Sequence, residues 1–288
     1  MAWPYIAPAA IMSLALVALP LVGLVAFSLF DWNLTRPGTT RFLGLGNYAA
    51  ILQDTAFWRA LATTAIFVVE SVALQMFAGV GIALLFSHAL PGMGVIRTLF
   101  LTPMMIAPIF AGMIWRLCLS DDFGAVKFIL QLFGWAQPPL WLADPTFALH
   151  TVVVINSWQW IPFVVLFVLA GLQIIPRELY EAAYLDGASR FRAFVSITLP
   201  LLSPILVTVL IFRTIDAVKV FDVIYATTGG GPGDSTETIS YLVYQQATNF
   251  FNLGYGSAIA VIMLFIVAAL ALLLVALSTR GAGPGQNS

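Results

Sequence analysis

Four charged side chains follow one another at steps of three residues, with alternating sign, in one long apolar run. They are Arg213, Asp216, Lys219 and Asp222. Residues three apart are neighbours on a helix, so the series predicts ion pairs along one helix. In a bilayer core a charged side chain costs about 2.5 to 3.5 kcal/mol, so it faces protein or a water-filled cavity. The four charges therefore either neutralise one another or contact a polar solute. Arg213 and Asp216 lie deepest in the predicted span, so they are the better candidates for solute contact.

A second apolar run places two amides and two aromatic rings on one helical face. Amides both donate and accept hydrogen bonds, and an aromatic ring covers the apolar face of a pyranose, so this set suits a sugar. Amide-mediated helix packing is the alternative interpretation. Glu70, in another run, is expected either to pair with Arg213 or Lys219 or to stay protonated alone. The candidate solute pathway comprises Asn156, Gln159, Trp160, Phe163, Arg213, Asp216 and Lys219.

The sequence lacks the residues that several kinds of chemistry require. The only lysines, Lys127 and Lys219, are not preceded by the glycine pattern of a phosphate-binding loop. His88 and His150 are isolated in the sequence, and no histidine, cysteine and carboxylate set has the spacing of a metal site. A net charge of -1 gives no electrostatic footprint for nucleic acid. We expect no catalytic, metal or cofactor site on this chain, and no nucleic-acid partner.

The elements that position these residues are membrane spans. Hydrophobic residues make up 61% of the chain and charged residues 9%, whereas a soluble domain has about 25% charged residues. A bilayer core about 30 Å thick needs about 20 apolar residues in a helix. The sequence therefore predicts an all-α membrane protein with one permease-like domain over residues 1–280 and a disordered tail over 281–288. The predicted spans are residues 5–30, 60–86, 99–119, 147–172, 201–225 and 256–279.

A charged loop of residues 176–200 separates two of these runs and is predicted to form two short helices. Pro176 suits a first helical position, and Gly187 suits a left-handed cap that ends the first helix. Ser189 can cap the second helix, and Pro200 is expected to stop it. The apolar face of the second helix is expected at Phe191, Phe194, Val195 and Thr198.

Six spans place both termini on one side of the membrane. The basic residues divide almost evenly between the sides, but three arginines crowd into the short loop around Gly187: Arg177, Arg190 and Arg192. Positive loops face the cytoplasm, so this density favours cytoplasmic termini and a cytoplasmic loop. The orientation is taken mainly from the family resemblance of this loop.

The order of residues in this loop resembles the EAA signature of membrane subunits of ABC importers. The segments that carry it are 181–183 (Glu-Ala-Ala), 186–188 (Asp-Gly-Ala) and 197–200 (Ile-Thr-Leu-Pro). In that family such a helix-turn-helix docks on a separate ATPase subunit. The resemblance implies that coupling to the ATPase falls on Glu181, Ala182, Asp186, Gly187, Arg190 and Phe194.

Further segments are similar to permeases of the maltose, trehalose and glycerol-3-phosphate importer branch. They are residues 42–48 (Phe-Leu-Gly-Leu-Gly-Asn-Tyr), 212–222 and the glycine-rich 228–233. Thr63 stands where the family has Asn, and a basic N-terminal segment is missing, so no role is transferred to either place.

The resemblance implies a complex in the bacterial inner membrane. Its other members are a second, similar permease subunit, an ATPase dimer that holds the ATP and magnesium, and an external solute-binding protein. The expected activity is translocation of a sugar or sugar derivative by alternating access. The alternative is an ion- or proton-coupled secondary carrier that uses Glu70, Asp216 and Lys219 as a relay, which leaves the cytoplasmic loop unexplained.

Overall fold

The chain folds into a bundle of long apolar helices. The computed structural model describes residues 3–88, 91–135 and 137–281. Its described part contains five helices long and apolar enough to cross a membrane, or six if one bent pair counts as a single span, which confirms the predicted fold class. The long helices are α1 (Trp3–Ser28), α3 (Thr55–Phe86), α7 (Pro145–Ile174), α10 (Leu199–Val218) and α13 (Leu253–Gly281).

The bent pair is the predicted third span. α4 (Met93–Leu101) continues into a 3-10 turn, η1 (Thr102–Met105), and α5 (Pro108–Cys118) then leaves at an angle of 98°. Pro103 lies at the start of η1, and Pro108 is the first residue of α5. A proline lacks a backbone donor and fits the first turn of a helix, so these two prolines place the break between the two helices.

Local sequence sets the starts of the two central helices. The Asp54 side chain accepts a hydrogen bond of 2.8 Å from the backbone N–H of Ala56 and caps α3. Asp144 does the same for α7 through Thr146, at 2.8 Å, and Pro145 occupies the first helical position. Such caps satisfy backbone donors that lack a partner within the helix.

α3 and α7 pack closely because a glycine lies where they approach. A Cβ added to Gly79 would lie 2.6 Å from Val164 of α7, closer than side chains pack. Apolar side chains fill the space on either side of this contact, among them the fully buried Phe67 and Val152. The α3–α7 pair is the centre of the bundle, onto which α10 packs.

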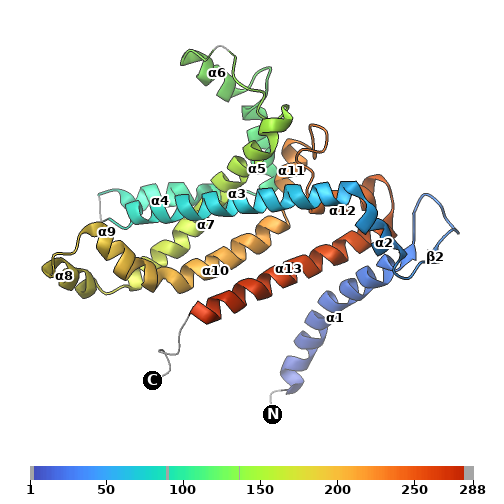
Figure 1. Cartoon of the computed structure of the whole chain (residues 1–288), viewed down its shortest axis with the longest axis horizontal. Helices are drawn as coiled ribbons and strands as arrows, with labels where there is room; N and C mark the ends of the chain where they lie inside the picture. The colour runs from blue at the N-terminus through green and yellow to red at the C-terminus, as the bar shows by residue number, and fades with distance from the viewer. Residues whose placement is uncertain (1–2, 89–90, 136, 282–288) are drawn as a thin grey trace.

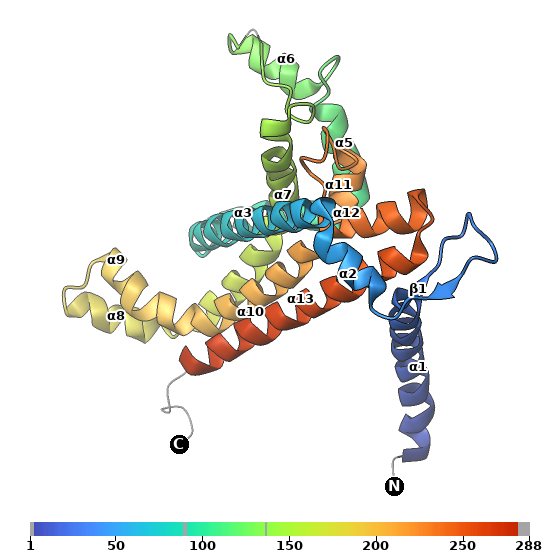
Figure 2. The same ribbon diagram turned by 45° about the vertical axis from the view of Figure 1, so that its right-hand side comes forward.

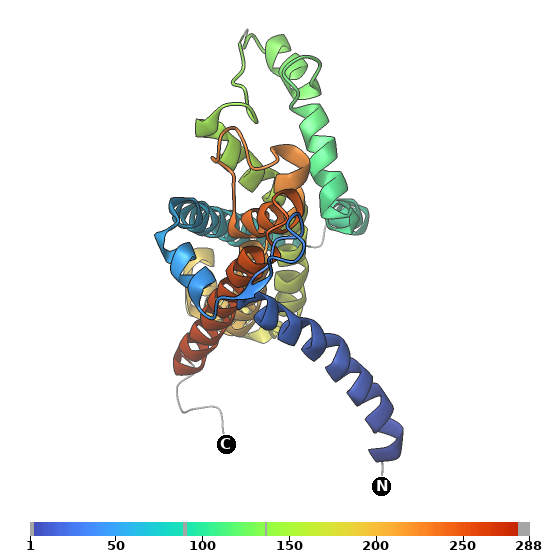
Figure 3. The same cartoon turned by 90° about the vertical axis from the view of Figure 1, so that its right-hand side faces the viewer.

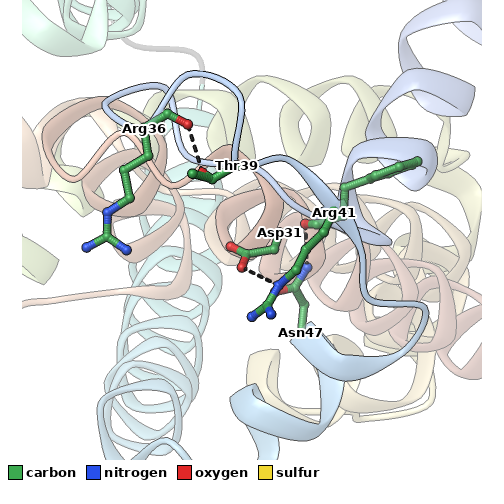
Figure 4. A network of polar contacts seen from close by, with 6 residues as sticks. Asp31, Arg36, Thr39, Arg41 and Asn47 are labelled. Atoms are coloured by element: carbon green, nitrogen blue, oxygen red, sulfur yellow. Dashed lines mark hydrogen bonds and ion pairs between the residues drawn. The ribbon is translucent and has the colours of Figure 1, made fainter.

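The end of α1 is held by a short polar connection. Strands β1 (Phe30–Asp31) and β2 (Arg41–Phe42) pair antiparallel, with Asp31 opposite Arg41, and lead into α2 (Gly46–Gln53). The Asn47 amide donates to the carbonyls of Ser28 and Phe30, at 2.8 and 2.9 Å. Figure 4 shows Asn47 beside the pair of Asp31 and Arg41. The Asp31–Arg41 ion pair of 3.1 Å is largely exposed, so Asn47 carries more of the stabilisation.

Short helices project from the bundle at two separate places. α8 (Arg177–Leu185) and α9 (Arg190–Ala193) extend on the left of Figure 1, away from β2 and α2, and α6 (Ala125–Leu132) lies beyond the ends of α5 and α7 at the top. α1 leans away from the other helices (Figure 3). α13 runs to Gly281, the first residue of the predicted tail, and residues 282–288 lie outside the described part.

Candidate functional site

The centre of the polar site is Arg213 on α10, whose side chain is 3% exposed. Its Nε donates to Oε1 of Gln75 and its Nη1 donates to Oδ2 of Asp216, both at 2.8 Å. The ion pair predicted from the spacing of three is therefore confirmed for Arg213 and Asp216. The Asp216 side chain is 47% exposed, so the carboxylate of the pair is accessible while the guanidinium is buried.

An amide relay joins this pair to α7. Gln75 of α3 is completely buried, and its Nε2 donates to Oδ1 of Asn156 at 3.0 Å. Gln75 was not among the residues predicted from the sequence. Its signal was present, because an amide in the middle of an apolar span requires a polar partner. Three helices thus meet through one continuous chain of hydrogen bonds.

Aromatic rings cover one side of the cluster. The guanidinium carbon of Arg213 lies 4.5 Å from the centre of the Trp160 ring, within the range of a cation–π contact. The rings of Trp160 and Phe163 lie edge to face with centres 6.2 Å apart. The structure therefore brings together five of the predicted pathway residues: Asn156, Trp160, Phe163, Arg213 and Asp216.

Gln159 has a different position from the one predicted. It is 1% exposed, and its Nε2 donates at 2.7 Å to the carbonyl oxygen of Ile106, in the break between η1 and α5. A broken helix leaves carbonyls without partners, and the Gln159 amide satisfies one of them. Gln159 therefore joins α7 to the bent span.

Lys219 lies outside the cluster because the predicted fifth span is wrong at its end. α10 stops at Val218, and a separate helix, α11 (Asp222–Thr227), begins after a three-residue break. The hydroxyls of Thr238 and Ser240 donate to the carbonyls of Val220 and Val218, at 3.3 and 3.5 Å, and stabilise this helix end. Lys219 and Asp222 are exposed, and no ion pair joins them among the described side chains.

Glu70 pairs with a residue that the sequence analysis treated as isolated. Its Oε2 lies 2.8 Å from Nδ1 of His150 on α7. The prediction that Glu70 pairs with Arg213 or Lys219, or stays alone, is wrong. Glu70 and Gln75 are five residues apart on α3 and therefore lie on different sides of the helix. Gln75 contacts Arg213, so Glu70 points away from it.

The hairpin of α8 and α9 has the caps that the sequence predicted. Gly187 has a φ of +78°. The N–H of Gly187 donates to the carbonyl of Tyr184, and that of Ala188 to Ala183, at 3.1 and 2.9 Å, which is a Schellman motif. The Ser189 hydroxyl accepts from the Arg192 N–H at 3.3 Å. Pro176 lies directly before α8 rather than inside it.

The helix that follows the hairpin does not stop at Pro200. α9 passes through a π-helical turn, η2 (Phe194–Thr198), directly into α10, so residues 190–218 form one span. A π turn shifts the hydrogen bonds by one residue, which accommodates the donor that Pro200 lacks. Ala193 and Thr198 face the bundle, whereas Phe191, expected on the apolar face, is 76% exposed.

Most of the predicted coupling residues lie on an open surface. Glu181, Ala182, Asp186, Gly187 and Arg190 are all exposed, and Phe194 is partly buried. A hydrogen bond joins the hairpin to the span: the hydroxyls of Tyr180 and Thr198 lie 2.8 Å apart. A cavity of about 400 Å³ separates the hairpin from the end of α3 and is bordered by His88, Tyr184 and Arg190.

Beyond the spans, a buried carboxyl lies in the loop between α11 and the short helix α12 (Ile239–Tyr244). Glu237 is 8% exposed. Burial raises the pKa of the Glu237 carboxyl, the charge of Asp234 raises it further, and that of Arg59 lowers it. Arg59 itself pairs with Asp234 at 3.1 Å.

Known proteins are similar to this chain in sequence and in the arrangement of their helices. A sequence model of the family described as binding-protein-dependent transport system inner membrane component matches residues 75–281. The trehalose/maltose transport system permease protein MalF of Thermococcus litoralis is 41% identical over 257 residues, which cover 88% of this chain and 85% of that protein. The sulfoquinovosyl glycerol transport system permease protein SmoG of Agrobacterium fabrum is 39% identical over 258 residues, covering 90% and 83%.

One solved structure extends the likeness to the fold. A chain of the bacterial alginate ABC transporter, solved in complex with an alginate pentasaccharide-bound periplasmic protein, superposes with a TM-score of 0.86. The match covers 98% of this chain and 94% of that one, at 20% identity. At this identity the likeness establishes the shared fold.

Proposed function

Because this chain belongs to the family of binding-protein-dependent transport system inner membrane components, we propose that it moves a sugar by alternating access. It is a multi-pass inner-membrane protein and the permease component of a sugar ABC importer. The observation that supports the pathway is the Arg213 cluster. It places a half-exposed carboxylate and two aromatic rings at one point among three spans.

We propose that the solute is a neutral sugar. The Arg213 guanidinium already faces the Asp216 carboxylate at 2.8 Å, so the pair presents no net charge. An anionic sugar would have to compete with Asp216 for Arg213. A neutral sugar instead finds an acceptor in Asp216 and an apolar ring face in Trp160. The relatives are named for both uncharged and charged solutes, so their names do not distinguish a neutral sugar from an anionic one. The proposal therefore rests on the charges of the site.

In the proposed mechanism the energy comes from another polypeptide. The exposed hairpin of α8 and α9 docks on an ATPase dimer, and the rigid continuation of α9 into α10 transmits its movement to Arg213. A second permease subunit and an external solute-binding protein complete the complex. The hairpin and both termini then face the cytoplasm, and α2, α6 and α11 face outward.

The experiment that tests this function is uptake by the complete complex in proteoliposomes. Labelled trehalose and maltose represent neutral sugars, and a sugar phosphate of similar size represents anionic ones. We expect ATP-dependent uptake of a neutral sugar, with an affinity weakened about tenfold by Trp160→Ala, equal to about 1.4 kcal/mol. Trp160→Phe keeps a ring and serves as the matched control. Uptake of the sugar phosphate alone, or equal uptake by both Trp160 variants and the parent, contradicts the proposed site.

The alternative is the ion- or proton-coupled carrier, and the Glu70–His150 pair is the observation that favours it. A proton relay would need continuity between this pair and the solute site. In the described part, the Arg213 cluster connects through Gln75 and Asn156 instead. Uptake driven by an imposed proton gradient without ATP would select the carrier.

A further inference from the structure

Helix α6 exposes the side chains that an ordinary surface helix hides. It lies between α5 and α7 in the chain, and Figure 2 shows it beyond the ends of both, on the side of α11 and remote from α8 and α9. Phe128 is 63% exposed, Ile129 50% and Leu132 70%. The face turned toward the protein carries Val126, Lys127 and Leu130, all partly buried.

The inner face of α6 is well anchored. Val126 packs against the buried core cluster, as do Trp141 and Leu142. The Lys127 ammonium group donates to the backbone carbonyl of Asp121, in the turn before the helix. α6 is therefore held in a fixed orientation, so the exposure of its apolar face is a property of the fold.

The flanking residues extend the apolar surface. Phe123 is 73% exposed, Phe133 86% and Trp135 50%. Soluble proteins rarely leave a contiguous apolar patch this dense in contact with water, because each square ångström costs about 25 cal/mol. Something covers this face in the working protein.

Charge and position identify a lipid surface. Asp122 lies before the helix, and the exposed face of Phe128, Ile129 and Leu132 carries no charge among the described side chains. A binding protein that docks and departs in each cycle needs a more polar surface. The short connection to a membrane helix also favours lipid. α5 ends at Cys118, and Gly124, the residue directly before α6, follows only six positions later. Trp135, which is 50% exposed, follows the helix, as expected of a ring in an interfacial aromatic belt.

We propose that α6 lies in the surface of the bilayer leaflet opposite to α8 and α9, with Phe128, Ile129, Leu132 and Phe133 among the lipid chains. Interfacial helices insert such a face about 5 to 10 Å below the headgroups. Zwitterionic lipid is sufficient, because the only lysine of the helix is directed to a backbone carbonyl. α6 thereby anchors α5, which packs tightly on α11: a Cβ on Gly112 would lie 2.7 Å from that of Ala226.

Spin labels in the reconstituted complex test the proposal. In a Cys118→Ser background, with the partner subunits free of cysteine, a label is attached at Leu132→Cys and at the control Asp122→Cys. The complex is placed in phosphatidylcholine liposomes. Collision rates are measured with oxygen, which enters lipid, and with a water-soluble nickel chelate. We expect the ratio of oxygen to nickel accessibility to be several-fold higher at residue 132 than at residue 122.

Three results would overturn the proposal. One is equal ratios at the two positions, which means that α6 faces water. Another is a label at residue 132 that reaches water until the binding protein is added, which assigns the face to protein docking. A third is protection from both reagents, which assigns it to a partner subunit. Phe133→Cys lies outside the helix and carries the same test if Leu132→Cys does not assemble.

Discussion

At the scale of single residues, the proposed solute site depends on the balance of charge around one guanidinium. Arg213 is nearly inaccessible, yet its partner Asp216 is half-exposed. The exposed part of the Asp216 carboxylate can therefore accept hydrogen bonds from a solute, while its other side pairs with the buried Arg213. Gln75 and Asn156 fix the other edge of the guanidinium, so Arg213 cannot turn to follow a solute.

Removing the Asp216 charge should change solute preference. In Asp216→Asn the Arg213 charge is no longer balanced, so we expect weaker uptake of a neutral sugar and a relative gain for a sugar phosphate. A shift of about tenfold in the ratio corresponds to about 1.4 kcal/mol. Competition uptake in proteoliposomes measures the ratio. Asp216→Glu keeps the charge and is the control, and an unchanged ratio in Asp216→Asn contradicts a neutral site.

A second residue-scale prediction concerns Glu237, whose pKa is raised by burial in the folded chain. The unfolded chain releases this proton at a lower pH, near 4.3, so folding loses stability as the pH rises from there through the folded pKa. Glu237→Gln should therefore unfold at a higher temperature than the parent at neutral pH. The difference should vanish at about pH 4.

Thermal unfolding of the purified complex at several pH values measures this effect. Asp122→Asn, at an exposed position before α6, is the matched control and should unfold at the same temperature as the parent. A Glu237→Gln variant that is less stable than the parent at neutral pH would show that the carboxylate is stabilising.

At the scale of elements, two glycines set the geometry of the pathway and of the hairpin. Gly79 permits the close crossing of α3 and α7, and that crossing brings Gln75 within reach of Asn156. Gly187 permits the left-handed residue between α8 and α9. The physical reasons differ, because one position lacks space and the other needs an unusual backbone angle.

Gly187→Val should uncouple transport while leaving the bundle intact. A Cβ there meets no atom within 4 Å, so the only cost is the positive φ, about 1 to 2 kcal/mol, and more for a β-branched residue. We expect normal membrane levels, with solute-stimulated ATPase activity and uptake both reduced. Gly92→Val tests the same strain, since Gly92 has a φ of +79° with open space around it but lies outside the hairpin. Full activity of Gly187→Val would contradict the coupling role.

Gly79→Leu should act on the fold instead. Its side chain would collide with Val164, so α3 and α7 must separate, at a cost of about 1 to 3 kcal/mol or more. We expect lower levels of folded protein, measured by size-exclusion chromatography. Gly81→Leu, two residues away in open space, is the control.

At the scale of the whole molecule, the span that carries Arg213 also carries the hairpin. α9, η2 and α10 form one continuous helical span, so we expect a displacement of the hairpin to reach the proposed solute site. The break at residues 219–221 lies beyond Arg213, on the side of α11.

This arrangement predicts that transport depends on nucleotide hydrolysis. Vanadate should abolish uptake by the complex, and a proton gradient without ATP should not restore it. The control is solute binding by the binding protein, which vanadate should leave unchanged. Uptake that persists with vanadate would favour the secondary carrier.

Local physics in the sequence was sufficient for the existence of the membrane helices and for the caps at Gly187 and Ser189. Apolar runs of about 20 residues specify membrane helices, and Gly187 and Ser189 specify a helix end and a helix start whatever surrounds them. The spacing of Arg213 and Asp216 was likewise enough for their ion pair. Such features depend on neighbours within a few residues in the chain.

Only the tertiary structure decided which helices share the polar site. Gln75 and Asn156 are 81 residues apart, and Glu70 meets His150 across 80 residues, through a crossing that Gly79 allows. The end of α10 at Val218 depends on hydroxyls of Thr238 and Ser240, and the passage through Pro200 on a π turn. For the side chains and the end of α10, the hydrogen-bond partner comes from a segment far away in the chain. At Pro200 the cause is a π turn. The periodicity of apolar residues along the chain encodes neither.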